Sequence, residues 1–353
     1  MLFAKKDHLI GLDIGSRFIK VADIRQDSNG LALKHFGMKS LPMDTIAEGI
    51  IKEPDVIIET IKDLISESKL KEKNVAVSIA GYSVIIKKIV LSKMSDEELS
   101  ERIQFEAEQY IPFDVQDMNI DFHILGDSDQ NPNQMKVMLV AAKKEVVDTY
   151  LEILNRAGLT PCVIDVDAFA LENAFATNYF FGDEDGEIVL IDIGANKINI
   201  NILKDNVSAL TRDVALGGEQ ITKEIMSEFG LSFDEAEAVK TGTPSDKVSP
   251  YALQDIVTKI SSNWCNEIKR AIDFFYTTDS DLNIKRIFLS GGCAQIEGLI
   301  DLLKVETSVD VELLNSFKAL SLEVKHIDSQ YLQRVAPQAA IVVGLALRRV
   351  SDK

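Results

Sequence analysis

One short pattern occurs twice in this sequence and constrains its fold more than any other feature. The first copy, residues 11–16, reads Gly-Leu-Asp-Ile-Gly-Ser, and the second copy, residues 190–196, reads Leu-Ile-Asp-Ile-Gly-Ala-Asn. Each copy lies between two apolar segments, so each predicts a strand, a tight turn and a returning strand. Because the same hairpin is repeated far apart in a chain of 353 residues, we expect a fold built from two related halves.

The chemistry of the repeated pattern points to a bound polyphosphate. Each copy places an aspartate, Asp13 or Asp192, at the end of an apolar strand with a glycine close behind it. A carboxylate in such a place is costly unless it is paired or binds a cation, and a glycine lets backbone N–H groups approach an anion. Two such hairpins that face each other would hold a polyphosphate, with a hydrated Mg²⁺ between the two aspartates. One copy alone is more simply a hairpin with an aspartate in its turn, and the second copy favours the binding hypothesis.

A third motif, Ser290-Gly291-Gly292, follows a predicted strand at residues 284–289 and precedes a predicted helix at residues 296–303. Paired glycines at the end of a strand would let a base or a ribose lie against the backbone. A plain strand-to-helix turn explains these residues equally well, so the motif adds to the two hairpins but does not stand alone.

Composition and charge limit the classes of partner. The net charge is −18, and duplex affinity rests largely on Lys and Arg, so we expect no nucleic-acid partner. Three widely spaced cysteines and four scattered histidines show no metal-ligand spacing and no disulfide framework, which indicates a reducing compartment. The first six residues contain no apolar segment of a signal peptide. The longest strongly apolar run, residues 339–347, is about half the length needed to cross a bilayer. We therefore expect a soluble, cytoplasmic protein.

The predicted strands and helices divide the chain into four parts. These are a first lobe (1–82, 159–186 and 336–353), an inserted block (83–158), the core of a second lobe (187–216 and 284–335) and a helical subdomain (217–283). The inserted block predicts the order β-α-β-β-α, with its first strand interrupted at Lys87-Lys88. Ser95 and Glu98 fit a capping box at the start of its first helix, and Pro112 is expected to end that helix. An acidic loop at residues 182–187 is expected to mark the boundary between the lobes.

With these motifs the chain resembles the actin/Hsp70/sugar-kinase superfamily. The phosphate hairpins and adenosine turn of that superfamily look like residues 13–20, 192–198 and 290–293. Within it the chain is similar to the cell-division protein FtsA and, more closely, to the PilM family of actin-like proteins in type IV pilus assembly. The segments that carry this resemblance are 11–16, 104–113 (QFEAEQYIPF), 163–169 (VIDVDAF), 191–195 (IDIGA), 217–222 (GGEQIT) and 339–347. The resemblance covers nearly the whole chain. It implies an α/β, actin-like (ribonuclease H-like) duplicated two-lobe fold, in which the inserted block is the subdomain that FtsA-like proteins carry.

The same resemblance implies ATP and Mg²⁺ as bound cofactors, with Asp13 and Asp192 as metal ligands. The cofactor-binding residues it assigns are Asp13, Gly15, Ser16, Arg17 and Lys20 in the first hairpin, Asp192, Gly194, Ala195 and Asn196 in the second, and Gly217, Gly218, Glu237, Lys240, Gly291 and Gly292 elsewhere. Strand alternation leaves two places open for Lys20, at a phosphate or on the surface. Glu237 and Lys240 are similar to a ribose- and adenine-contacting pair, although an E-x-x-K pair on a helix is usually only a surface ion pair.

Asp167 is the catalytic residue that the resemblance implies. It lies at a predicted strand-to-helix junction and is similar in place to the acid or amide that orients water in actin-like ATPases. An N-cap of the helix predicted at residues 168–181 explains this aspartate at least as well.

The resemblance also implies a membrane partner. FtsA-like proteins end in a linker and an amphipathic membrane helix, whereas this sequence stops at Lys353, directly after a helix of the fold. We therefore expect the chain to lie at the inner membrane only through its partner. In the PilM family that partner is the short cytoplasmic N-terminal tail of PilN, which docks in a groove beside the inserted subdomain. Other pilus assembly proteins and a second copy of the chain are further expected contacts.

The function expected from this reading is an ATP-binding assembly scaffold with slow or no ATPase activity. A metabolite kinase of the same superfamily is an alternative, but a kinase needs a general base and an acceptor pocket, and the sequence shows no second catalytic acid in a clear context. An FtsA-like cell-division protein is the other alternative.

Overall fold

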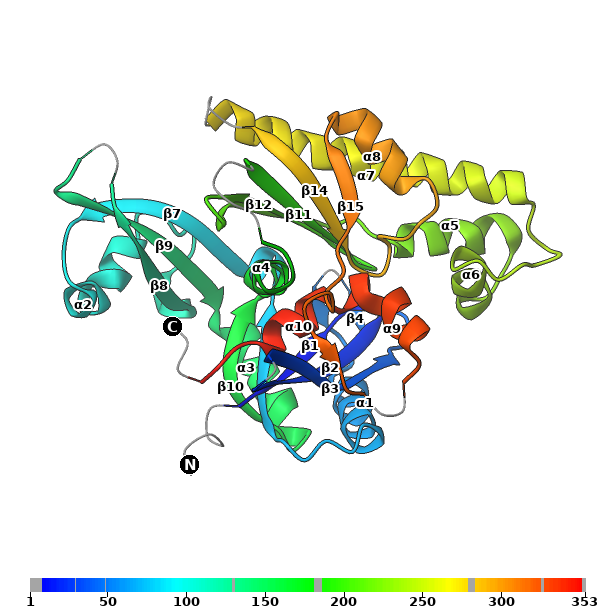
Figure 1. The fold of residues 1–353 in the computed structure, drawn as a ribbon, viewed down its shortest axis with the longest axis horizontal. Helices are drawn as coiled ribbons and strands as arrows, with labels where there is room; N and C mark the ends of the chain where they lie inside the picture. The colour runs from blue at the N-terminus through cyan, green and yellow to red at the C-terminus, as the bar shows by residue number, and fades with distance from the viewer. Residues whose placement is uncertain are drawn as a thin grey trace.

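The computed structural model describes residues 8–28, 30–47, 49–128, 131–180, 186–278, 283–324 and 327–350. The middle of the predicted boundary loop, residues 182–185, lies outside the described residues. The fold is mixed α/β, with two large sheets, one three-stranded sheet and one short two-stranded sheet (Figure 1).

The first large sheet combines an antiparallel meander with two parallel strands. β1, β2 and β3 run antiparallel in sequence order, while β6 and β10 continue the sheet on the other side of β1 in parallel with it. The central strand β1 is buried along its whole length, as expected for a strand with apolar residues on both faces. Its strands, in spatial order, are β10 (Thr160–Val166), β6 (Asn74–Ile79), β1 (Ile10–Ile14), β2 (Phe18–Asp27), β3 (Gly30–Ser40) and β16 (Ser321–Leu322).

The second large sheet repeats this arrangement. β11, β12 and β13 form the antiparallel meander, and β14 and β15 continue in parallel with β11. Its strands, in spatial order, are β13 (Val207–Val214), β12 (Ile198–Lys204), β11 (Glu187–Ile193), β14 (Ile284–Ser290) and β15 (Asp310–Leu313). The shared topology confirms the duplicated two-lobe fold expected from the repeated hairpin.

Helices join the two sheets and cover them. α4 (Asp167–Asn178) lies between the sheets, with Leu171 and Phe175 packed against Leu190 and Phe288 of the second sheet (Figure 1). α1 (Pro54–Glu67) begins at a proline, which suits the first position of a helix, and packs its apolar face on the first sheet.

The last helix, α10 (Ala340–Ala346), is completely buried against α4 and β1. The sequence predicts the last helix over residues 337–349, but residues 336–339 form a 3₁₀ turn, so α10 is shorter. A Cβ on Gly344 would lie 1.7 Å from the carbonyl oxygen of Ala170, so only glycine allows this approach.

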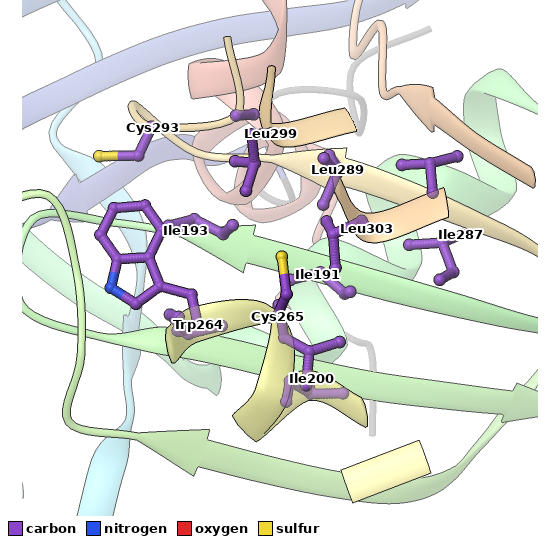
Figure 2. Packing of buried hydrophobic residues seen from close by; sticks show 14 of the residues in the cluster. Ile191, Ile193, Ile200, Trp264, Cys265, Ile287, Leu289, Cys293, Leu299 and Leu303 are labelled. Carbon is purple, nitrogen blue, oxygen red and sulfur yellow. The ribbon is translucent and has the colours of Figure 1, made fainter. Parts of the chain in front are cut away.

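The helical part beside the second sheet contains α5 (Glu219–Phe229), α6 (Phe233–Lys240) and α7 (Pro250–Thr278). Trp264 of α7 is fully buried and donates its indole N–H to Gln220 of α5 at 2.8 Å. Figure 2 shows Trp264 with strand residues such as Ile193 and, from α8 (Leu299–Thr307), Leu303. This core fixes the helices against the second sheet.

The inserted block forms a separate three-stranded sheet that projects away from the two lobes (Figure 1). The capping box of Ser95 and Glu98 is present. The predicted interruption at Lys87-Lys88 was wrong, because β7 pairs with β9 without a break. α2 ends at Ala107, several residues before Pro112. The elements are β7 (Val84–Ser92), α2 (Asp96–Ala107), β8 (Met118–Asp127), β9 (Gln134–Lys143) and α3 (Lys144–Arg156).

The division into four subdomains stays a prediction. α3 buries Ile153 and Leu154 in the core of the first lobe, and β16 pairs with β3 of the first sheet, although the predicted ranges assign both elements elsewhere. The remaining short elements are β4 (Ile46–Ala47), β5 (Ile50–Ile51) and α9 (Ser329–Val335). Among the described residues, no helix is both long enough and apolar enough to cross a membrane.

Candidate functional site

The two repeated hairpins close in the same way. The N–H of Gly15 donates to the carbonyl of Phe18 at 3.1 Å, and the N–H of Gly194 donates to the carbonyl of Lys197 at 2.9 Å. Asp13 in β1 and Asp192 in β11 each lie two residues before this glycine and one residue before the end of their strand. The repeat in the sequence is therefore a repeat in three dimensions.

Lys20 is largely buried between the two hairpins, a region called the cleft below, and does not lie on the surface. It faces Asp13 across the β1–β2 pair, and its Nζ donates to Asp13 Oδ2 at 2.6 Å. Burial alone would lower the pKa of Lys20, but Asp13, Asp192 and Asp167 raise it above its ordinary value. A lysine that three carboxylates keep charged is suited to bind an anion placed between them.

Asp192 is buried and accepts a hydrogen bond from the hydroxyl of Ser290 at 2.9 Å. Burial raises the pKa of Asp192 from 3.8 to about 6, and the nearby charges of Asp13 and Asp167 add to this effect, while Lys20 and Ser290 oppose it. Asp13 and Lys20 of the first hairpin affect the pKa of Asp192 in the second. The two hairpins therefore bring their aspartates close together, in one cleft.

Asp167 begins α4, but its side chain is not an N-cap. The N-cap residue is Val166, and the carboxylate of Asp167 lies 2.5 Å from Nζ of Lys197. Burial would lower the pKa of Lys197, but Asp167 and Asp213 raise it above its ordinary range. The N-cap explanation of Asp167 is therefore not supported, and the predicted acid is held in an ion pair.

Arg17 and Asn196 tie the hairpin tips to the opposite lobe. The Arg17 guanidinium lies 4.7 Å from the ring centre of Phe233, and 3.8 Å from the carboxylate of Asp234 in α6. The Asn196 amide donates to the carbonyl of Ile46 at 3.2 Å. These contacts close the mouth of the cleft.

The space left between the tips is a cavity of about 10 Å³. A nucleotide needs a pocket of some hundreds of Å³, so binding requires the lobes to move apart. Its lining residues are Ser16, Arg17, Met43, Asp44, Ala195, Asn196, Glu219, Phe233 and Glu237. Four of the predicted cofactor-binding residues at the hairpin tips, and Glu237 from α6, thus meet at one place.

The E-x-x-K pair belongs to the cleft rather than to the open surface. Lys240 Nζ lies 2.5 Å from Glu237, and it also donates to Thr222 at 2.8 Å and to the carbonyl of Gly218 at 3.3 Å. A Cβ on Gly218 would lie 2.2 Å from Sγ of Cys293, which follows the Gly-Gly turn. The structure brings the pair, the glycine loop and the predicted adenosine turn together.

The remaining predicted glycines lie where backbone segments approach closely. A Cβ on Gly217 would lie 2.4 Å from the carbonyl oxygen of Ala195, and one on Gly291 would lie 2.4 Å from that of Ile193. Gly291 also has a φ of +93°, which favours glycine. Around Gly292, by contrast, the described residues leave open space.

The donor set fits Mg-ATP in its chemistry. Mg²⁺ at nucleotide sites takes one or two carboxylates and completes its shell with waters and phosphate oxygens. Asp13 and Asp192 could supply these carboxylates. The described part of the chain contains no group of three or more His, Cys, Asp or Glu that would hold a metal without such help. A metal here would therefore depend on the phosphates for part of its shell.

Sequence reasoning missed several polar residues at this cleft. Lys197 and Ser290 contact Asp167 and Asp192, and neither was assigned as a binding residue, although both lie in the segments compared with the phosphate hairpin and the adenosine turn. Lys197 stands inside the second predicted hairpin, so its place in a tight turn was the available signal. Asp213 gave no local signal, because its partners, the N–H of Gly81 and the amide of Asn199, come from other strands and loops.

The comparisons with known proteins identify the family. The family described as type IV pilus assembly protein PilM matches residues 11–350. The chain belongs to the PilM family. The family match and the two-lobe fold confirm the resemblance expected from the motifs.

Relatives and solved structures extend this result. The cell division protein FtsA of Enterococcus hirae is 22% identical over 88% of this chain and 78% of that protein. A solved PilM-PilN type IV pilus biogenesis complex superimposes with a TM-score of 0.83 at 29% identity, covering 96% of this chain and 98% of that one. The ethanolamine utilization protein EutJ from Carboxydothermus hydrogenoformans shares the fold, with a TM-score of 0.60 at 13% identity over 97% of this chain and 89% of that one.

Proposed function

We propose that this PilM-family chain binds Mg-ATP between its two lobes and acts as a cytoplasmic scaffold of the type IV pilus assembly complex. The observation that carries the nucleotide site is the convergence of Asp13, Lys20 and Asp192 from duplicated hairpins on one cleft. Charged groups kept in this arrangement without a ligand are costly, and a bound polyphosphate with its cation would offset that cost. The family membership supports the assembly role.

Each predicted residue has a role in this proposal. Asp13 and Asp192 hold Mg²⁺, which neutralises phosphate charge when it is bound, and Lys20 binds the phosphates. The backbones at Gly217-Gly218 and Gly291-Gly292 admit the adenosine, and Glu237 and Lys240 contact it. Asp167 faces the terminal phosphate, and turnover is slow or absent. The hairpin residues Gly15, Ser16, Arg17, Gly194, Ala195 and Asn196 surround the phosphates.

A calorimetric titration tests the nucleotide site. Asp13→Ala and Asp192→Ala should each weaken Mg-ATP binding at least about tenfold, because one charge-assisted contact is worth roughly 1.5–3 kcal/mol. Binding of metal-free ATP should change much less. Asp121→Ala, an exposed aspartate on β8 of the inserted subdomain, is the matched control and should leave Mg-ATP affinity unchanged. Unchanged affinity in both cleft variants would show that this is not the site.

The proposed partner is the cytoplasmic N-terminal tail of an inner-membrane PilN-like protein. The solved relative is a PilM-PilN complex, which supports a partner of this kind. The chain would then lie at the inner membrane through this tail, in contact with other pilus assembly proteins and with further copies of itself. The family match favours this role over a metabolite kinase and over an FtsA-like division protein.

The tail is proposed to dock where the inserted subdomain meets the first lobe. Phe113 is 43% exposed there, and Nζ of Lys143 lies 4.7 Å from its ring centre. Lys143 ends β9 immediately before α3, the helix that packs into the core of the first lobe. An exposed aromatic ring at such a junction is a good anchor for a peptide.

A peptide-binding assay tests this docking position. Phe113→Ala should weaken binding of a synthetic PilN-like N-terminal tail at least about tenfold, as expected for an aromatic anchor. Phe105→Ala is the matched control: Phe105 is 64% exposed on α2 of the same subdomain and should not matter. Fluorescence anisotropy with a labelled peptide measures both. Equal affinities for both variants and the unchanged chain would remove Phe113 from the proposed groove.

A further inference from the structure

An ion pair crosses the cleft beside the proposed phosphate site. Asp167 begins α4, which directly follows β10 of the first sheet, and Lys197 lies in the hairpin turn of the second sheet. Their Nζ and Oδ2 atoms are 2.5 Å apart, and their side chains are only 29% and 13% exposed for Lys197 and Asp167. A contact this close and this sheltered is not an incidental surface pair.

Lys197 is not needed to build its turn. The first hairpin closes with the same hydrogen bond but has Phe18 at the position that Lys197 occupies in the second. The turn therefore accepts an apolar side chain there. The turn itself therefore does not explain why the second copy has a lysine at this position, whereas the contact of Lys197 with Asp167 does.

The charge of Lys197 is directed to Asp167 in particular. Asp213 is also near enough to raise the pKa of this lysine. However, the two carboxylate oxygens of Asp213 already accept hydrogen bonds, from the N–H of Gly81 at 2.6 Å and from the amide of Asn199 at 2.8 Å. Asp167 is the carboxylate that Lys197 contacts directly.

We infer that Lys197 restrains Asp167, so that the chain binds ATP but hydrolyses it slowly. This inference rests on the proposed nucleotide site. In hydrolysis a water oxygen bonds to the γ-phosphorus, the bond to the bridging oxygen breaks, and a base accepts the proton of the water, giving ADP and inorganic phosphate. A base must turn an oxygen toward that water, and the contact of Lys197 with Oδ2 holds the carboxylate of Asp167 in one orientation. Lys197 is thus a positioning residue that acts through Asp167.

Turnover measurements on variants of the full chain test the inference. Lys197→Met keeps a long side chain but loses the charge, and it should raise kcat for ADP release at least about tenfold, since a positioned base contributes 10²–10⁴-fold. Lys197→Arg should keep the slow rate, because it retains the ion pair. Adding Asp167→Asn to Lys197→Met should remove the gain. Lys62→Met, on the exposed face of α1, is the control and should leave kcat unchanged.

Two measurements without turnover accompany the rates. Calorimetry should show that Mg-ATP still binds to Lys197→Met, so that a change in kcat is not a loss of substrate. In the nucleotide-free protein, Lys197→Met and Asp167→Asn should have non-additive effects on the unfolding midpoint, because each removes the same ion pair.

The outcomes separate the inference from the proposed function. If Lys197→Met binds Mg-ATP but has an unchanged or lower kcat, the lysine serves the phosphates and the inference is wrong. Additive effects on nucleotide-free unfolding would show that the pair does not form and would overturn it as well. If the unchanged chain binds no Mg-ATP at all, the proposed function fails, and the inference fails with it.

Discussion

Asp192 meets two opposing requirements. Burial at the end of β11 raises its pKa to about 6, so a charged Asp192 destabilises the folded chain when no cation is bound. The same charge is what a Mg²⁺ ion would bind. In the folded chain the carboxyl holds its proton up to about pH 6, whereas in the unfolded chain it releases it near its ordinary value of 3.8. The folded state therefore binds more protons in this window, and stability falls as the pH rises through it.

Asp192→Asn should make the ligand-free chain more stable at pH 7–8. The substitution removes the buried charge and keeps an oxygen that can accept a hydrogen bond from Ser290. The gain in the free energy of unfolding should be about 2–3 kcal/mol, which corresponds to the rise in the pKa of Asp192 from 3.8 to about 6. The gain should vanish below about pH 4, where the aspartate is protonated in both states. Urea unfolding at a series of pH values measures it. A gain that does not change with pH would mean that the carboxyl of Asp192 is not responsible.

At the scale of single elements, α10 shows how close packing depends on one small residue. The helix lies completely buried between α4 and β1, and Gly344 is the point at which it touches the backbone of Ala170. The small residues Ala340, Gly344 and Ala346 of this helix allow the close packing. The atoms that face Gly344 are backbone atoms of Ala170, and these cannot move aside as the end of a flexible side chain could.

Gly344→Ala should lower the free energy of unfolding by about 1–3 kcal/mol or more, because the added methyl group would overlap the carbonyl of Ala170 and force the two helices apart. Gly292→Ala is the control, since a Cβ there meets open space among the described residues and should change stability little. Chemical denaturation of both variants measures the difference. If the two variants were equally stable, α10 would not pack on α4 as closely as the structure has it.

For the whole molecule, the closed cleft is the feature that decides how a nucleotide could bind. Arg17 reaches from the first hairpin to Phe233 and Asp234 of α6, and the space behind it holds only about 10 Å³. The two lobes must separate before a ligand of nucleotide size fits. Arg17 therefore bears on the rate of binding as well as on the bound state.

Arg17→Ala should speed both association and release of a fluorescent ATP analogue by about five- to thirtyfold. The stacking on Phe233 and the weak ion pairs of Arg17 together account for about 1–2 kcal/mol of closure, which corresponds to that factor. Stopped-flow fluorescence measures both rates. Arg102→Ala, on the exposed face of α2, should leave them unchanged. Rates that stay the same in Arg17→Ala would show that lobe closure does not limit access to the cleft.

The sequence by itself determined the local parts of this protein. The two hairpins with their aspartates, the capped helix of the inserted block and the helical stretch after Gly218 were predictable because strands, turns and caps depend on residues close together in the chain. The duplicated fold followed from the repeat, and its family from short motifs within it. Short elements such as β15 and β16 gave no such signal, since their strands form only by pairing with distant ones.

The tertiary structure alone decided which charged groups meet. Lys197 and Asp167 are 30 positions apart and Ser290 and Asp192 are 98 apart, so no local pattern could pair them. It also decided that Lys20 lies inside the cleft and that Arg17 crosses it to α6. The physical reason is that burial and long-range charge arise only after the two sheets have packed around α4, and these two effects set the chemistry of the site.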